Sequence, residues 1–143
     1  MIKHINLLSI IFLITLITSC NDNNLPENDK LLGTWTRVGD NYARMKISVK
    51  KENNNCVGRI VFLPTMAQKN GFVFNDLKWK NINKINNNKY SLSDFDIIVN
   101  TFGDRVVEKY NKSFIYFMSK NEIKLEFKNN KKRMQYWVKN QNY

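Results

Sequence analysis

Residues 113–139 read SFIYFMSKNEIKLEFKNNKKRMQYWVK and carry the clearest structural signal in the chain. In the middle of this stretch, Ile123, Leu125 and Phe127 alternate one by one with charged residues. A period of two is typical of a β-strand with one buried face and one solvated face. Lys-Asn and Asn-Asn pairs bound this segment on either side, and an apolar run lies beyond each pair. The stretch therefore predicts three antiparallel strands joined by tight turns.

The same pattern continues through the chain before residue 113. Segments rich in β-branched and aromatic residues lie at 31–38, 44–50, 57–63, 72–82, 90–102 and 105–110. Clusters of Gly, Asn and Asp separate most of them, residues 84–89 are expected to turn, and residues 65–71 to form a loop without a convincing helix. The pattern predicts an all-β protein, a single small antiparallel β-barrel of about eight to ten strands. Closure into a barrel removes exposed sheet edges, although a two-sheet sandwich would give a similar pattern.

A short motif at the start of the first predicted strand points to a particular kind of barrel. Leu32-Gly33-Thr34-Trp35 resembles the G-x-W signature of lipocalins and related calycin barrels. The resemblance implies that Trp35 closes one end of a lipocalin-like barrel. It also implies that an arginine of the last strand packs across the indole ring, and Arg133 occupies a fitting position for that cation–π contact.

The N-terminal 20 residues have the composition of a secretory signal. Lys3 precedes an apolar run at 5–17, which is shorter than the about 20 residues that a membrane-spanning helix needs. Ile17-Thr18-Ser19-Cys20 then resembles the lipobox of bacterial lipoproteins. The resemblance implies cleavage before Cys20, a thioether-linked diacylglycerol on its sulfur, and further acylation, by palmitate or a similar fatty acid, of the new N-terminus. Several acyl chains together make stable membrane attachment.

These features predict the organisation of the chain. Residues 1–19 are the lipoprotein signal peptide, residues 20–30 the lipidated cysteine with a polar flexible tether, and residues 31–143 the lipocalin-like barrel domain. With lipid on Cys20, Cys56 has no partner for a disulfide and is expected to be a buried structural thiol. The predicted location is the bacterial cell envelope, with the domain outside the cytoplasm and the anchor in a membrane, the outer membrane being favoured.

Composition argues against most familiar enzymes. The only histidine, His4, lies in the predicted signal peptide, so no imidazole is expected in the mature chain for a catalytic triad or a metal. The glycines stand singly, without a phosphate-binding pattern. We therefore expect no enzyme, no cofactor and no metal. A catalytic alternative would need a cleft holding a close pair, with a raised pKa, among Asp76, Asp94, Asp96, Asp104 and Glu108.

The net charge of +11 favours an anionic partner. Outside the cytoplasm we expect an anionic envelope component and no nucleic acid. The leading hypothesis is a small hydrophobic or amphiphilic ligand inside the barrel, lined by Met45, Ile47, Val49, Ile60, Phe62, Ile123, Leu125 and Phe127. The alternative is an interaction module with a filled core and a basic, aromatic surface formed by Lys78, Trp79, Lys80, Lys132, Arg133, Tyr136 and Trp137.

Overall fold

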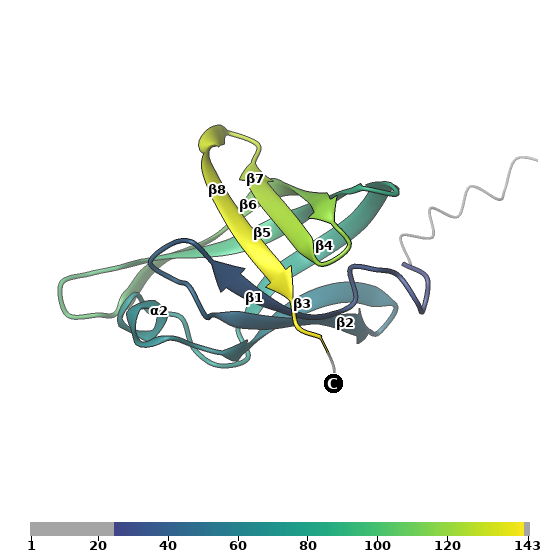
Figure 1. The fold of residues 1–143 in the computed structure, drawn as a ribbon. Helices are drawn as coiled ribbons and strands as arrows, with labels where there is room; N and C mark the ends of the chain where they lie inside the picture. Colours follow the sequence, from purple (N-terminus) through teal and green to yellow (C-terminus); the bar gives the residue numbers. More distant parts are fainter. Residues whose placement is uncertain (1–24, 142–143) are drawn as a thin grey trace, which may run out of the picture.

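A computed structural model describes residues 25–141, which form a closed barrel of eight antiparallel strands (Figure 1). Each strand pairs with the next one in the chain, and β8 returns to pair with β1. The all-β prediction is confirmed, and the barrel is found rather than the sandwich. Within the described range, no helix is both long and apolar enough to cross a membrane. The predicted signal peptide and Cys20 lie outside the described residues.

The strands are β1 (Gly33–Val38), β2 (Lys46–Glu52), β3 (Asn55–Phe62), β4 (Leu77–Asn86), β5 (Lys89–Val99), β6 (Arg105–Ser119), β7 (Glu122–Phe127) and β8 (Asn130–Lys139). The predicted strands at 105–110 and 113–119 are one continuous strand, β6. One short helix, α2 (Thr65–Lys69), replaces the expected loop, because the carbonyl of Pro64 accepts from the backbone of Ala67 and Gln68. A helix of this length has too few residues to show helical periodicity.

Because successive strands run in opposite directions, the connections alternate between two ends of the barrel. We call one the N-terminal end, formed by residues 25–32 and the turns at 53–54, 87–88 and 120–121. The other, the loop end, carries the connections at 39–45, 63–76, 100–104 and 128–129. At the loop end, β5 and β6 extend beyond the barrel as a two-stranded arm, at the left of Figure 1.

The barrel core is filled by large side chains. Trp35, Trp79 and Trp137 are fully buried, and the rings of Trp79 and Trp137 meet edge to face with centroids 5.2 Å apart. Aliphatic side chains from the strands pack around them in a single cluster. An eight-stranded barrel is narrow enough for side chains to fill its interior.

The described part of the predicted tether is packed on the barrel. Leu25 is only 2% exposed. The buried carboxylate of Asp29 accepts hydrogen bonds from the Tyr90 hydroxyl at 2.7 Å, the Leu31 backbone at 2.9 Å and the Lys84 ammonium at 3.0 Å. The prediction of a flexible tether up to residue 30 is therefore wrong for residues 25–30. The folded domain therefore includes Leu25, whose side chain joins the core cluster although the surrounding sequence is polar.

The cation packed across Trp35 comes from Lys139, not from Arg133. Lys139 pairs with Trp35 in the β1–β8 register, and its ammonium lies 5.4 Å from the centre of the indole ring. Arg133 lies in the first half of β8, near the loop end, where its guanidinium carbon is 4.4 Å from the Phe127 ring centre. The closure contact predicted for Arg133 is wrong, because β8 runs the length of the barrel between Arg133 and Trp35.

Candidate functional site

Seven of the eight residues predicted to line a ligand cavity are buried: Met45, Ile47, Val49, Ile60, Ile123, Leu125 and Phe127. Phe62 is 42% exposed, so its predicted inward position is wrong. The cause is a register shift at the end of β3. Ile47 pairs with Ile60 but Lys46 pairs with Phe62, so Val61 is an extra residue and the in–out alternation changes there. The seven buried residues belong to the packed core cluster, and Phe62 lies outside it.

The residues predicted to form a basic, aromatic binding surface are not all exposed. Trp79 and Trp137 are fully buried and Lys78 nearly so, whereas Lys132, Arg133 and Tyr136 are exposed and Lys80 is partly exposed. A second register shift explains the two consecutive buried residues of β4. Gly58 pairs with Trp79 and Arg59 pairs with Leu77, which leaves Lys78 as the extra residue of a bulge. The seven residues proposed for that surface therefore do not form one exposed patch.

Lys78 belongs to a buried polar network across the barrel. The Asp94 carboxylate accepts from Lys78 Nζ at 2.8 Å, from Trp79 Nε1 at 2.9 Å and from Gln135 Nε2 at 3.3 Å. Lys78 also donates to the carbonyl of Phe95, and Gln135 accepts from Trp137 Nε1 at 3.2 Å. Burial lowers the pKa of Lys78, and the charge of Asp94 opposes that shift. The network joins β4, β5 and β8.

Two of the other carboxylates considered for catalysis are held in ion pairs with arginines. Asp96 is paired with Arg133 at 2.7 Å, and Asp76 with Arg105 at 2.6 Å. Burial raises the pKa of Asp96, but the hydrogen bond and charge of Arg133 outweigh burial and hold that pKa below its usual value. Within residues 25–141, no cluster of three or more His, Cys, Asp and Glu side chains is placed to hold a metal ion.

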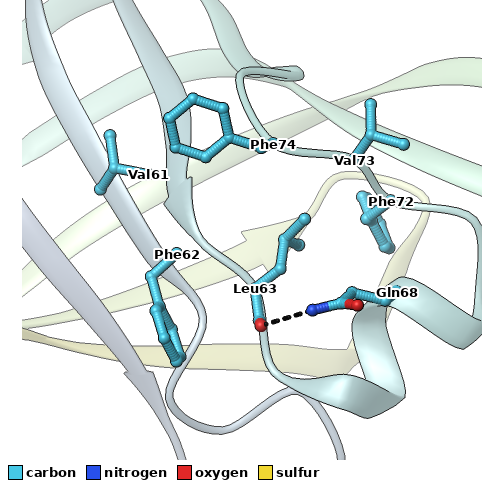
Figure 2. Close-up of a pocket in the computed structure, with 7 residues that line it drawn as sticks. All are labelled: Val61, Phe62, Leu63, Gln68, Phe72, Val73 and Phe74. Atoms are coloured by element: carbon cyan, nitrogen blue, oxygen red, sulfur yellow. Dashed lines mark hydrogen bonds between the residues drawn. The ribbon is translucent and has the colours of Figure 1, made fainter.

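An apolar groove lies outside the barrel at its loop end. It has a volume of about 580 Å³ and is formed by the end of β3, by α2 and by the segment that leads to β4. Figure 2 shows the ring of Phe74 directed toward Val61, with Gln68 donating a hydrogen bond to the carbonyl of Leu63 at 3.1 Å. The lining is apolar apart from one amide: Val61, Phe62, Leu63, Gln68, Phe72, Val73 and Phe74.

Backbone hydrogen bonds hold the two sides of this groove together. The Asn75 backbone donates to Ile60 at 2.9 Å, and Ile60 donates to the carbonyl of Asp76 at 3.0 Å. Phe72 is buried beneath this loop, while Val73 and Phe74 project outward and Phe74 is 69% exposed. The strand predicted at 72–82 therefore starts too early, because β4 begins only at Leu77. Solvent-exposed apolar clusters of this kind mark binding surfaces in many proteins.

The arm extends the apolar surface beyond the groove. Gly71, at positive φ, lies directly against Val99 of β5, and the Arg105 guanidinium donates to the Gly71 carbonyl at 2.7 Å. Phe102 at the tip of the arm is 89% exposed, and Ile98 and Val106 are exposed as well. Arg105 is neutralised by Asp76 and Glu108. The loop end therefore combines exposed apolar side chains with a cation that is already paired.

The sequence contained a signal for this site that strand periodicity alone did not resolve. Residues 61–63 and 72–74 are two apolar triplets that flank the connection between β3 and β4. Three consecutive apolar residues cannot all face one side of a strand, so at least one must face outward or belong to a loop. The two triplets lie on opposite walls of the groove.

Comparison of the chain with protein families, with curated proteins and with solved structures finds no match. Its functional assignment therefore depends on its own residues and geometry.

Proposed function

We propose that the protein is a lipid-anchored, non-enzymatic lipoprotein of the bacterial cell envelope that binds a small hydrophobic or amphiphilic molecule. The lipobox pattern ending at Cys20 supports the anchor. The apolar groove at the loop end supports the binding function, in place of the barrel interior. The observation that carries the proposal is its volume of about 580 Å³, which lies within the usual range for small-molecule sites.

The groove suits a ligand with an apolar part and a polar part. Transfer of apolar ligand surface onto Val61, Val73 and Phe74 contributes about 25 cal/mol for each Å² removed from water. Gln68 offers one amide for a polar group. Lys46 lies 5.9 Å from the Phe62 ring centre and supplies a cation at the edge of the groove. An amphiphile with an acidic head group matches these surroundings.

The anchor is tested by labelling cells with an alkyne fatty acid and separating membranes from soluble fractions. We expect wild-type protein to carry the label and remain in the membrane fraction. The Cys20→Ala variant should lose both the label and the membrane association. Label on the variant would show that Cys20 is not the acylated residue.

Ligand binding is tested by fluorescence titration of the chain from Asn21 onward with a fluorescent fatty acid. Replacing Val73 and Phe74 together by serine is expected to weaken binding by at least about tenfold, since it removes the most exposed wall of the groove. Ile85→Ser is the control, because Ile85 is about as exposed as Val73 but lies at the C-terminal end of β4, near the N-terminal end of the barrel and away from the groove. Equal losses in both variants would contradict a binding site in the groove.

A second candidate is an interaction module that contacts another envelope component. The exposed apolar surface continues onto the arm, where Phe102 lies beyond the groove that a small ligand would fill. Crosslinking in intact cells tests this function. Phe102→Ser is expected to remove a specific protein crosslink while leaving fatty-acid binding unchanged. An unchanged crosslink pattern would contradict a role for the arm.

A further inference from the structure

A second pocket, separate from the apolar groove, opens between β6 and the β7–β8 turn. Its volume is about 440 Å³. It forms because pairing between β6 and β7 begins only at Ser113 and Phe127, while β6 continues along β5 as part of the arm. In Figure 1 the tip of the β7–β8 hairpin and the tip of the arm point in different directions. Cations and amides line the space: Lys109, Asn111, Lys112, Asn129, Asn130 and Arg133.

Arg133 is held in place before any ligand arrives. Its Nη1 lies 2.7 Å from Asp96 Oδ2, and its guanidinium carbon lies 4.4 Å from the centre of the Phe127 ring. These contacts fix the plane of the guanidinium, and its side chain is still 43% exposed. A guanidinium carries further N–H donors that one carboxylate oxygen does not occupy. Arg133 can therefore donate to a second anion in the pocket at little cost in side-chain entropy.

The other two cations have no carboxylate partner in the described part of the chain. None of the ion pairs within residues 25–141 includes Lys109 or Lys112. Glu108, which precedes Lys109 in the sequence, pairs with Arg105, and Glu126 of the neighbouring strand β7 pairs with Lys124. The positive charge of the pocket is therefore only partly compensated, by Asp96.

We propose that this pocket binds an anionic sugar, a monosaccharide unit that carries a carboxylate or a phosphate. The acidic group would lie among Lys109, Lys112 and Arg133. The three asparagine amides each offer donors and an acceptor, which match sugar hydroxyls, whereas a bare inorganic anion would use the donors alone. This site shares no lining residue with the apolar groove, and the proposal holds whether or not that groove binds a ligand.

The experiment is calorimetric titration of the full protein as produced in the cell. If the protein is recovered in the membrane fraction, it is first reconstituted in phosphatidylcholine nanodiscs. The probes are a galacturonic acid trimer, the matching neutral galactose trimer and inorganic phosphate. We expect the galacturonate trimer to bind at least about tenfold more tightly than either of the other probes, because only it offers charge and hydroxyls together.

Two double variants with the same loss of charge separate the pocket from general electrostatics. K109Q/K112Q removes two cations that line the pocket, whereas K131Q/K132Q removes two exposed cations of the neighbouring hairpin that do not line it. K109Q/K112Q is expected to weaken galacturonate binding by at least about tenfold, and K131Q/K132Q by less than about threefold. All four lysines are exposed, so both variants should keep the unfolding temperature of the wild type, which is measured alongside.

Equal losses in the two variants, phosphate binding as tight as galacturonate binding, or no galacturonate binding would each overturn the proposal. Phosphatidylcholine vesicles that contain a glucuronosyl-diacylglycerol distinguish a lipid head group from a free glycan. Binding to these vesicles with the same dependence on Lys109 and Lys112 would support the site and assign the head group as a source. Equally tight binding to phosphatidylglycerol vesicles, unaffected by the K109Q/K112Q substitutions, would overturn the site.

Discussion

The ammonium nitrogen of Lys78 lies 2.8 Å from the carboxylate of Asp94, and both side chains are almost completely buried inside the barrel. Removing two charges from water is costly, and the attraction between them offsets that cost only when the remaining hydrogen-bonding groups are also satisfied. Here Trp79 and Gln135 donate to the same carboxylate. The pair therefore fixes how three strands meet in the core.

Removing one member of this pair should be strongly destabilising. Asp94→Asn leaves Lys78 buried without a counter-charge, and we expect a loss of about 3–5 kcal/mol in the free energy of unfolding. Urea denaturation near neutral pH measures it. Asp96→Asn is the control, because its partner Arg133 is partly exposed and the expected loss is only about 1 kcal/mol. Similar losses in both variants would contradict a special role for the buried pair.

The contact between Lys139 and Trp35 gives a second prediction. Lys139→Ala is expected to cost about 0.5–2 kcal/mol and to shift the NMR signal of the Trp35 indole N–H, since the cation leaves the ring. Arg133→Ala should leave that signal in place. A shift in the Arg133 variant and none in the Lys139 variant would contradict this assignment and support the Arg133–Trp35 contact that the sequence predicted.

Gly33 should be difficult to replace for a related reason. Its φ is +121°, and a Cβ atom there would lie 3.0 Å from Cε of Lys139. Gly33→Ala is expected to lower the unfolding temperature, because the backbone is strained and the Lys139 stem must move. Gly39→Ala is the comparison: its φ is also positive, but nothing lies within 4 Å of the added Cβ. A larger loss at Gly39 would contradict the steric argument.

Asp29 predicts how stability depends on pH. Burial raises its pKa, but hydrogen bonds from Leu31, Tyr90 and Lys84 outweigh burial, and the folded pKa lies below the usual 3.8. The stabilising contribution is therefore present above about pH 3.8 and is lost as the pH falls through the lower folded value. Acid denaturation of Asp29→Asn should show a weaker pH dependence in that window. Glu27→Gln, at an almost fully exposed carboxylate, should leave the dependence unchanged.

Cys56 should be unreactive while the barrel is folded. Burial raises the pKa of its thiol to about 12, so the nucleophilic thiolate is scarce near neutral pH. We expect no maleimide labelling of the folded protein, and complete labelling of Cys56 in denaturant. Thr101→Cys on the exposed arm provides the positive control, since its added thiol should react at once. Rapid labelling of Cys56 in the native protein would contradict its burial.

The fold was predictable along a strand such as β7, whose register shifts place the extra residues on its partner strands and not on itself. Ile123, Leu125 and Phe127 alternate strictly and are all buried. The prediction failed for Phe62 and for the consecutive pair Lys78 and Trp79, because each lies at a register shift. A bulge inserts one residue on one strand, and no local sequence pattern reveals which residue it will be.

The candidate sites were less predictable, because they depend on how far each strand extends. The apolar groove exists because β3 ends at Phe62 and the chain passes through α2 before β4 begins. The basic pocket exists because β6 runs past the end of β7. The motif at Trp35 correctly predicted a cation packed on the indole ring, but the residue predicted for it, Arg133, was wrong. The cation is Lys139, because the register between β1 and β8 places Lys139 opposite Trp35.

The pairing of β8 with β1 also has a consequence for the order of folding. Trp35 meets Lys139 across the closing seam, so the barrel can close only when β8 reaches a strand more than a hundred positions earlier in the sequence. A chain that emerges from a ribosome or a translocation channel with its N-terminus first is, until then, a curled sheet with two unpaired edges. Such edges readily pair with other chains. Premature termination before β8 should therefore yield an aggregating protein rather than a shorter barrel.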